Sequence, residues 1–143
     1  MLIRVFLPVE SRASSGVLKI VQNLGFQVVN SEVVDFELPS IAGGSKRLSD
    51  FKGKWIWLNF WATWCGPCAV ELPTLESIHQ EFAGKKLAIL GVSIDQGASH
   101  LVRKYLVNKK IEFPNLHDIS GQISAKYQAS SVPSIYLISP DWK

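Results

Sequence analysis

The feature that most constrains this chain is a Cys-Gly-Pro-Cys motif at residues 65–68, between an apolar run and an amphipathic segment. The run from Trp55 to Ala62 is apolar except for Asn59 and is too short for an independent helix, so it predicts a buried central strand. Residues 67–82 carry apolar side chains at helical spacing and are followed by Gly84, so they predict a helix. The sequence therefore places two cysteines between the end of a strand and the start of a helix.

The rest of the chain alternates between strand and helix patterns. We expect strands at 33–39 (at a sheet edge), 86–94 and 134–138, a helical turn at 48–54 with Ser49 as its N-cap, and helices within 17–26 (ending at Gly25), at 99–109 and at 119–127. Strands separated by helix-sized segments predict an α/β sandwich with parallel crossovers. We divide the chain into an N-terminal extension, residues 1–32, and a main domain, residues 33–143.

Composition narrows the function classes. A chain of 143 residues with 47% apolar and 19% charged residues has the size and composition of one globular domain. Its 15 Lys and Arg against 12 Asp and Glu give a net charge of +3, and no dense basic run is interleaved with aromatics, so we do not expect a nucleic-acid partner. Apolar stretches reach only about eight residues, against the roughly 20 that a membrane-spanning helix needs. Because Arg4 interrupts the first of them, we do not expect a signal peptide there.

Cys65 and Cys68 have the spacing of a reversible dithiol. At the start of a helix, the thiol of Cys65 lies over unpaired backbone N–H groups at the positive end of the helix dipole, which favours the thiolate. Pro67 suits the first turn, where its missing N–H is not needed, and the spacing brings Cys68 within disulfide reach. We expect Cys65 to be the more exposed attacking thiol and Cys68 the resolving one.

Two metal-binding interpretations compete with this one. A closed zinc site needs four ligands, but the chain has only these two cysteines, and its three histidines are scattered without a paired ligand spacing. Copper(I) accepts two sulfur ligands, so a copper(I) metallochaperone or binding module remains the alternative function. The single methionine, Met1, argues against it.

The stretch Asn59-Phe-Trp-Ala-Thr-Trp-Cys-Gly-Pro-Cys68, followed by Glu71-Leu-Pro73, resembles the thioredoxin superfamily, specifically its TlpA/ResA-like extracytoplasmic branch. The resemblance covers about residues 33–140. It implies a thioredoxin-like α/β fold, with a central mixed sheet flanked by helices, and a thiol:disulfide oxidoreductase without a cofactor. Its implied role is to reduce disulfides in extracytoplasmic proteins, for example in cytochrome c maturation, in the bacterial periplasm or at the outer face of the membrane. The implied partners are a substrate protein with a disulfide or dithiol and a membrane thiol-electron donor.

The same resemblance assigns a cis peptide bond between Val132 and Pro133. In this family the proline faces the dithiol across the active site, and surrounding structure must hold the cis form. The backbone of Val132 would then present a strand-like edge to an incoming extended peptide. Without the cysteine motif, an ordinary trans proline before a strand would be the better interpretation.

Three further assignments surround the cysteines. Gly66 and Pro67 between them resemble the dipeptide of reducing thioredoxins, and Trp64 is expected to shield the dithiol and contact partners. Glu71 matches an acidic position that this branch links to cysteine acidity and proton handling. An equally weighted alternative is a solvated glutamate in the first helical turns, favoured there by the helix dipole.

The chain departs from the family at two places. Asn59 stands where cytosolic thioredoxins carry a buried aspartate, which leaves Glu71 or water to accept the proton of the resolving cysteine. The family also continues past the position of Pro140 with another strand and a closing helix, which this sequence lacks. An uncovered sheet edge invites pairing, so we expect residues 1–30, a neighbouring chain or an omitted tail to cover it, and we leave the oligomeric state open.

Overall fold

A computed structural model describes residues 3–7, 15–29 and 31–142 of the chain. Within these residues, six strands form one sheet in the order β2-β1-β8-β5-β6-β7, and β3 and β4 form a separate two-stranded sheet. Along the chain the elements are β1 (Ile3–Phe6), α2 (Ser15–Asn23), β2 (Phe26–Val28), β3 (Glu37–Pro39), β4 (Ser45–Arg47), the 3-10 helix η1 (Leu48–Phe51), β5 (Trp55–Trp61), α3 (Gly66–Phe82), β6 (Leu87–Ser93), α4 (Ser99–Asn108), β7 (Asn115–His117), α5 (Gln122–Lys126) and β8 (Ser134–Ile138).

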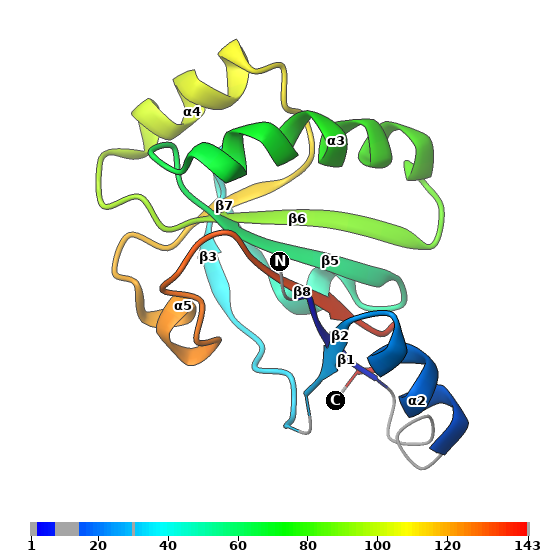
Figure 1. Cartoon of the computed structure of the whole chain (residues 1–143). Helices are drawn as coiled ribbons and strands as arrows, with labels where there is room; N and C mark the ends of the chain where they lie inside the picture. The colour runs from blue at the N-terminus through cyan, green and yellow to red at the C-terminus, as the bar shows by residue number, and fades with distance from the viewer. Residues whose placement is uncertain (1–2, 8–14, 30, 143) are drawn as a thin grey trace.

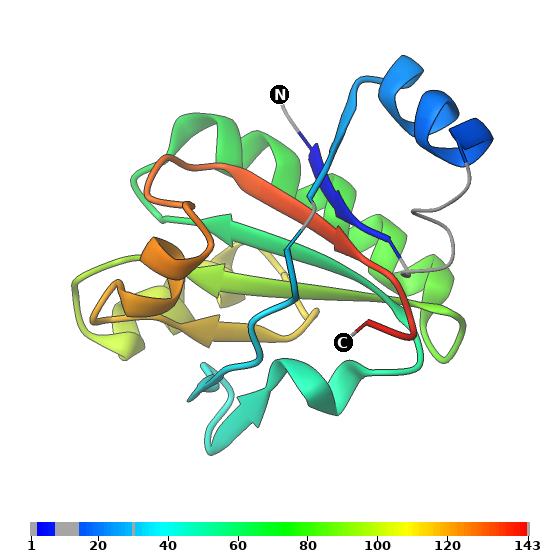
Figure 2. The ribbon, with the colours of Figure 1, turned by 90° about the horizontal axis from the view of Figure 1, so that it is seen from below.

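The predicted central strand is confirmed as β5, which pairs in parallel with β6 and antiparallel with β8. The sheet is therefore mixed, and helices lie on both of its faces. Helices α3 and α4 cover one face and α5 lies on the other (Figure 1), as the view from below also shows (Figure 2). This arrangement is the expected thioredoxin-like α/β fold.

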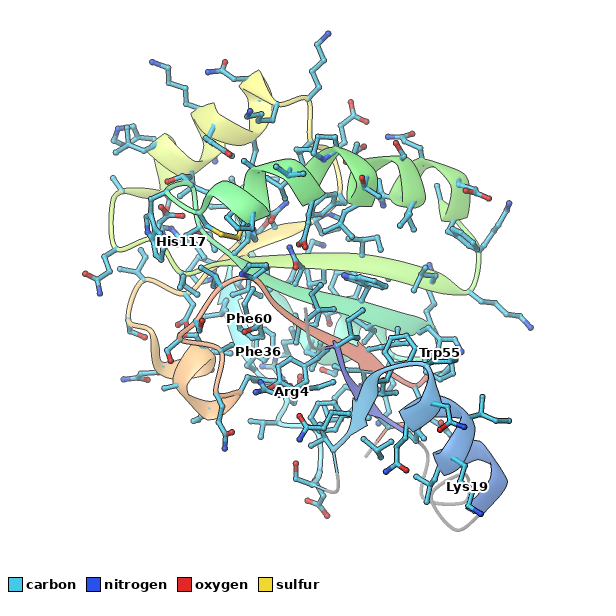
Figure 3. The ribbon with its side chains drawn as sticks, viewed as in Figure 1. Arg4, Lys19, Phe36, Trp55, Phe60 and His117 are labelled. Atoms are coloured by element: carbon cyan, nitrogen blue, oxygen red, sulfur yellow. A yellow bond between two sulfur atoms is a disulfide. The ribbon has the colours of Figure 1, made fainter. Side chains whose placement is uncertain are left out.

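Side chains of β5 alternate between the two faces of the sheet, as a period of two requires. Ile56, Leu58 and Phe60 are fully buried in a core cluster that also contains Phe36 (Figure 3). Trp61, also fully buried, belongs to a second cluster that packs under α3 and α4. The second cluster contains both cysteines, so the two sulfur-bearing side chains pack against buried apolar side chains.

The N-terminal segment covers the free edge of β8. Strand β1 runs parallel to β8, with Ile3 opposite Ile135, and β2 runs parallel to β1. Helix α2 connects them and ends at Asn23, before Gly25, which has a φ of 82°. Three covers for this edge were expected, and the N-terminal part of the same chain provides one of them through β1. The two strands were not predicted.

Two buried tyrosines bind the segment before β3 and, through Arg4, the N-terminal segment. The Tyr127 hydroxyl donates a hydrogen bond of 2.6 Å to the Val34 carbonyl, and the Tyr136 hydroxyl donates to the Tyr127 carbonyl. From β1, the Arg4 guanidinium donates to the Tyr136 hydroxyl at 2.7 Å. Burial raises the pKa of Tyr127, so its hydroxyl stays a neutral donor.

Some predicted elements need correction. The strand at 33–39 shrinks to β3 and pairs with β4 in a hairpin, rather than lying at the edge of the main sheet. Ser49 is not the N-cap of the following turn: η1 begins after Arg47, whose N–H donates to the Asp50 carboxylate at 2.8 Å. The last helix is α5, shorter than the predicted 119–127. None of the described helices is both long and apolar enough to cross a membrane.

Candidate active site

The two cysteines form a disulfide at the start of α3, just after the end of β5 (Figure 3). Their Cα atoms are 5.3 Å apart. Cys65 is the N-cap of α3, and its sulfur accepts a hydrogen bond of 3.2 Å from the backbone N–H of Cys68. Pro67 lies in the first turn, where it removes no helical hydrogen bond. A thiolate at Cys65 would therefore face the positive end of the helix dipole.

The surroundings of the two cysteines differ. Cys65 is 5% exposed and Cys68 is fully buried, so Cys65 is the more exposed of the pair, as predicted. Trp64, immediately before Cys65, is 67% exposed, which is unusual for so large an apolar side chain. Gly66 begins α3 with open space where a side chain would stand. The accessible side of the dithiol is therefore the side of Trp64 and Gly66.

The Val132–Pro133 peptide bond is cis, as expected from the resemblance. The next residue, Ser134, pairs with Phe60 near the end of β5. Because β8 is antiparallel to β5, the loop before β8 lies at the same end of the sheet as the dithiol. Val132 also packs against the cluster that contains Cys65 and Cys68. The fold therefore brings Val132 and Pro133 to the redox site.

Glu71 lies in α3, three residues beyond Cys68 and on neighbouring turns of the same face. Its carboxylate oxygen Oε2 is buried, and no group in the described part of the chain hydrogen-bonds to it. Burial raises the pKa of Glu71 above its ordinary value of 4.5, because the charged form loses hydration. Glu71 therefore keeps a proton to higher pH than a surface glutamate would.

Asn59 is a buried amide on β5, so this position of the strand carries no carboxylate. It is 1% exposed and lies on β5 between Leu58 and Phe60, which point to the opposite face of the sheet. Its amide oxygen is buried and has no hydrogen-bond partner among the residues that the structure describes. A neutral amide cannot accept a proton from Cys68 at neutral pH, so Glu71 and water stay the two predicted acceptors.

Asp95 is not among the predicted site residues, and it holds the loop before the dithiol. Its carboxylate accepts hydrogen bonds from the backbone N–H of Thr63 at 3.0 Å and from the Thr63 hydroxyl at 2.5 Å. A usable signal existed, because Asp95 follows the predicted strand 86–94, and the carboxyl ends of parallel strands meet at one edge of a sheet. The same edge carries Cys65.

A groove of about 600 Å³ adjoins this edge, with Trp64 on one side and Asp95 and Ile119 among its other walls. Ile119 is half exposed, so the groove offers apolar surface close to Cys65. Across residues 3–7, 15–29 and 31–142, no group of three or more His, Cys, Asp and Glu side chains gathers in a way that could hold a metal ion.

The chain shares this architecture with known proteins. Residues 29–143 match the AhpC/TSA family. Thiol-disulfide oxidoreductase ResA of Oceanobacillus iheyensis is 34% identical over 117 residues, which cover 79% of this chain and 60% of ResA. Thioredoxin-like protein YneN of Bacillus subtilis is 39% identical over 106 residues, which cover 73% of this chain and 61% of YneN.

A crystal structure from Chlorobium tepidum, of a protein proposed to be the thiol:disulfide interchange protein DsbE, superposes with a TM-score of 0.73. The two sequences are 30% identical, and the match covers 79% of each chain. The present chain spans about three fifths of the length of the curated relatives named above. On its fold, its Cys65–Cys68 pair and these matches, the chain belongs to the AhpC/TSA family and is a homologue of thiol-disulfide oxidoreductases of the ResA and DsbE type.

Proposed function

We propose that this chain is a thiol:disulfide oxidoreductase that reduces disulfides in partner proteins. The observation that carries the proposal is the Cys65–Cys68 disulfide at the N-terminus of α3, with the more exposed cysteine as the N-cap. A dithiol in this position can cycle between a disulfide and two thiols without moving the fold, because the first turn of the helix fixes both residues.

In the proposed reaction, the reduced protein supplies two electrons. The Cys65 thiolate attacks one sulfur of the partner disulfide, forming a mixed disulfide and releasing the other partner sulfur as a thiolate, which takes up a proton. Cys68 then loses its proton, attacks the sulfur of Cys65 and releases the second partner thiol. The products are a partner dithiol and the Cys65–Cys68 disulfide, the state that the structure shows.

Three neighbouring groups have proposed roles in binding the partner. Trp64 is exposed beside Cys65 and offers apolar contact surface. Val132 packs against the cluster that contains both cysteines, and we propose that its backbone pairs with an extended peptide segment around the partner's disulfide. Gly66 leaves open space above the dithiol for that segment.

The test of the proposed function is the reduction of insulin disulfides by dithiothreitol, followed by turbidity as the released chains precipitate. The chain is expected to accelerate this reaction at catalytic concentrations. A rate no higher than that of dithiothreitol alone would contradict the proposal.

We propose further that the reaction takes place outside the cytoplasm, with disulfide-containing proteins such as those of cytochrome c maturation as substrates and a membrane thiol-electron donor as the source of electrons. The support is the resemblance of residues 59–73 and the homology to ResA. A thiol reagent that cannot cross membranes should label Cys65 in intact cells after mild reduction. Labelling only after lysis would place the protein inside the cytoplasm.

Glu71 is proposed to govern the acidity of the dithiol. Because a carboxylate near a thiol disfavours the thiolate, Glu71→Gln is expected to lower the pKa of Cys65, as followed by thiolate absorbance in the reduced protein. Glu76→Gln, on the same helix but bound to the backbone N–H groups of Glu112 and Phe113, is the matched control. An unchanged titration in the Glu71 variant would make Glu71 a surface residue only.

The raised pKa of Glu71 also predicts how stability depends on pH. A carboxyl whose pKa is higher in the folded state contributes stability that is fully present below the unfolded pKa and is lost as pH rises through the folded pKa. Glu71→Gln, which stays neutral, is therefore expected to unfold at higher urea than the wild type at neutral pH. Well below pH 4.5 the two proteins should differ less. A constant difference across this range would contradict the burial effect.

A further inference from the structure

The carboxyl ends of three strands meet beside the dithiol. Trp61 on β5 pairs with Ser93 on β6, and Ser93 pairs with His117 on β7, so these three residues form one row across the sheet. The N–H of Ile94 donates to the Trp61 carbonyl at 2.9 Å, and this hydrogen bond holds together the segments that follow β5 and β6. Thr63 and Asp95, each two residues beyond this row, therefore emerge side by side.

The Asp95 carboxylate fastens the chain segment that leads to Cys65. It is 7% exposed and accepts from the backbone N–H and the hydroxyl of Thr63, and from the Ser93 hydroxyl at 2.7 Å. Only Trp64 separates Thr63 from Cys65. Hydrogen bonds to an ionised carboxylate are stronger than neutral ones, so this contact fixes the loop more firmly than backbone pairing alone.

The main chain of Asp95 is fixed as well. His117, 1% exposed, lies with Nε2 at 2.7 Å from the Asp95 carbonyl oxygen and Nδ1 at 2.8 Å from the Ser99 hydroxyl. A carbonyl only accepts, so Nε2 carries the hydrogen, and in the neutral ring Nδ1 accepts from Ser99. His117 thereby anchors Asp95 to β7 and to the start of α4.

We infer that Asp95 is a positioning residue for the redox reaction, because it holds Thr63 and thereby sets the placement of Trp64 and Cys65 at the start of α3. This inference rests on the proposed function, since the placement matters for the attack of Cys65 on a partner disulfide. Small displacements of a reacting group lower reaction rates steeply, whereas a rigid hydrogen-bonded support preserves them. His117 and Ser99 support the same arrangement from behind.

The test compares two substitutions at Asp95. Asp95→Asn keeps one of the two oxygens that accept from Thr63 and replaces the other with an amide NH2 group, whereas Asp95→Ala removes both oxygens. Asp95→Ala is expected to lower kcat/KM for insulin reduction by about tenfold, and Asp95→Asn by less, about threefold. Thr63→Val, which loses the hydroxyl and keeps the N–H, should fall between them and serves if Asp95→Ala does not fold.

Glu76→Ala is the control for general loss of stability. The Glu76 carboxylate also binds two backbone N–H groups, those of Glu112 and Phe113, but on a different loop. It should therefore lower stability without lowering kcat/KM. The inference would be overturned if Glu76→Ala lowered kcat/KM as much as Asp95→Ala does. It would also be overturned if Asp95→Ala kept the wild-type kcat/KM, or if Asp95→Asn were as slow as Asp95→Ala.

A second readout separates this inference from the proposed function. Hydrogen exchange of the Thr63 and Trp64 amides and the iodoacetamide alkylation rate of Cys65 need no disulfide substrate. Asp95→Ala should speed amide exchange and change the alkylation rate, and Asp95→Asn should restore both toward the wild type. If the wild type fails to reduce insulin but this pattern appears, the proposed function fails and the positioning role stands. If insulin is reduced but the pattern is absent, the positioning role fails.

Discussion

Cys65→Ala is expected to abolish insulin reduction, a loss on the order of a thousandfold or more, because it removes the attacking sulfur. Cys68→Ala is expected to stop the reaction after its first step, because no thiol remains to release the partner. The Cys68 variant should therefore accumulate as a mixed disulfide with a partner protein, visible as a higher-mass band that disappears on reduction. Mass spectrometry of the band should place the bond at Cys65.

The pair of variants tests the assignment of roles as well as the chemistry. A mixed disulfide that accumulates in Cys65→Ala and not in Cys68→Ala would reverse the two roles. Retention of full activity by either variant would contradict a dithiol mechanism altogether. Glu76→Gln, with both cysteines intact, should form no stable mixed disulfide and provides the baseline.

Gly91→Ala is expected to lower the free energy of unfolding by about 3 kcal/mol, because a side chain at this position overfills a hydrogen-bonded part of the core. Gly91 lies on β6 opposite Asn115 of β7, and an added Cβ would lie 2.0 Å from the Asn115 oxygen Oδ1. That oxygen accepts a 2.8 Å hydrogen bond from the Trp61 indole, and the Asn115 amide donates to the Phe113 carbonyl at 3.0 Å. Asn115 is 4% exposed and cannot move aside without leaving these groups unpaired.

Urea unfolding of matched variants measures this effect. Gly97→Ala is the control, since an added Cβ there would only touch Leu101 at 3.8 Å, and its effect should stay within about 0.5 kcal/mol. With Asn115→Ala already present, Gly91→Ala should cost less than it does alone, because the clashing atom is gone. If Gly91→Ala and Gly97→Ala lowered the free energy of unfolding equally, β6 would tolerate a side chain at position 91 and the prediction would be wrong.

The core of the site could be predicted from the sequence because its signals are local. The apolar run of β5, the Cys65–Cys68 spacing and the helical periodicity of α3 lie next to one another in the chain, so their relative placement needs no tertiary information. The cis bond at Pro133 was predicted from family resemblance, because nothing in the residues around it distinguishes cis from trans.

The parts that escaped prediction depend on distant partners. Strands β1, β2 and β7 have only four, three and three residues, and each exists because a neighbouring strand supplies its hydrogen bonds. Asp95 contacts Thr63 from 32 positions away, and His117 contacts Asp95 from 22. Periodicity and spacing do not show such contacts; the position of Asp95 after the predicted strand 86–94 indicates only the edge of the sheet at which it lies. Ser49 is not an N-cap because η1 begins at Leu48 with Arg47 as its N-cap, so that Ser49 lies inside the helix.

If Cys65 and Cys68 form a reversible redox couple, the couple has a measurable reduction potential. The protein would be equilibrated in dithiothreitol or glutathione buffers, and the thiol state read by trapping and by tryptophan fluorescence. We expect a single two-electron transition near the thioredoxin value of about −270 mV, because Gly66 and Pro67 form the dipeptide of reducing thioredoxins. A value near the DsbA potential of about −120 mV would contradict the reductase assignment, and the absence of any reversible transition would contradict the redox function itself.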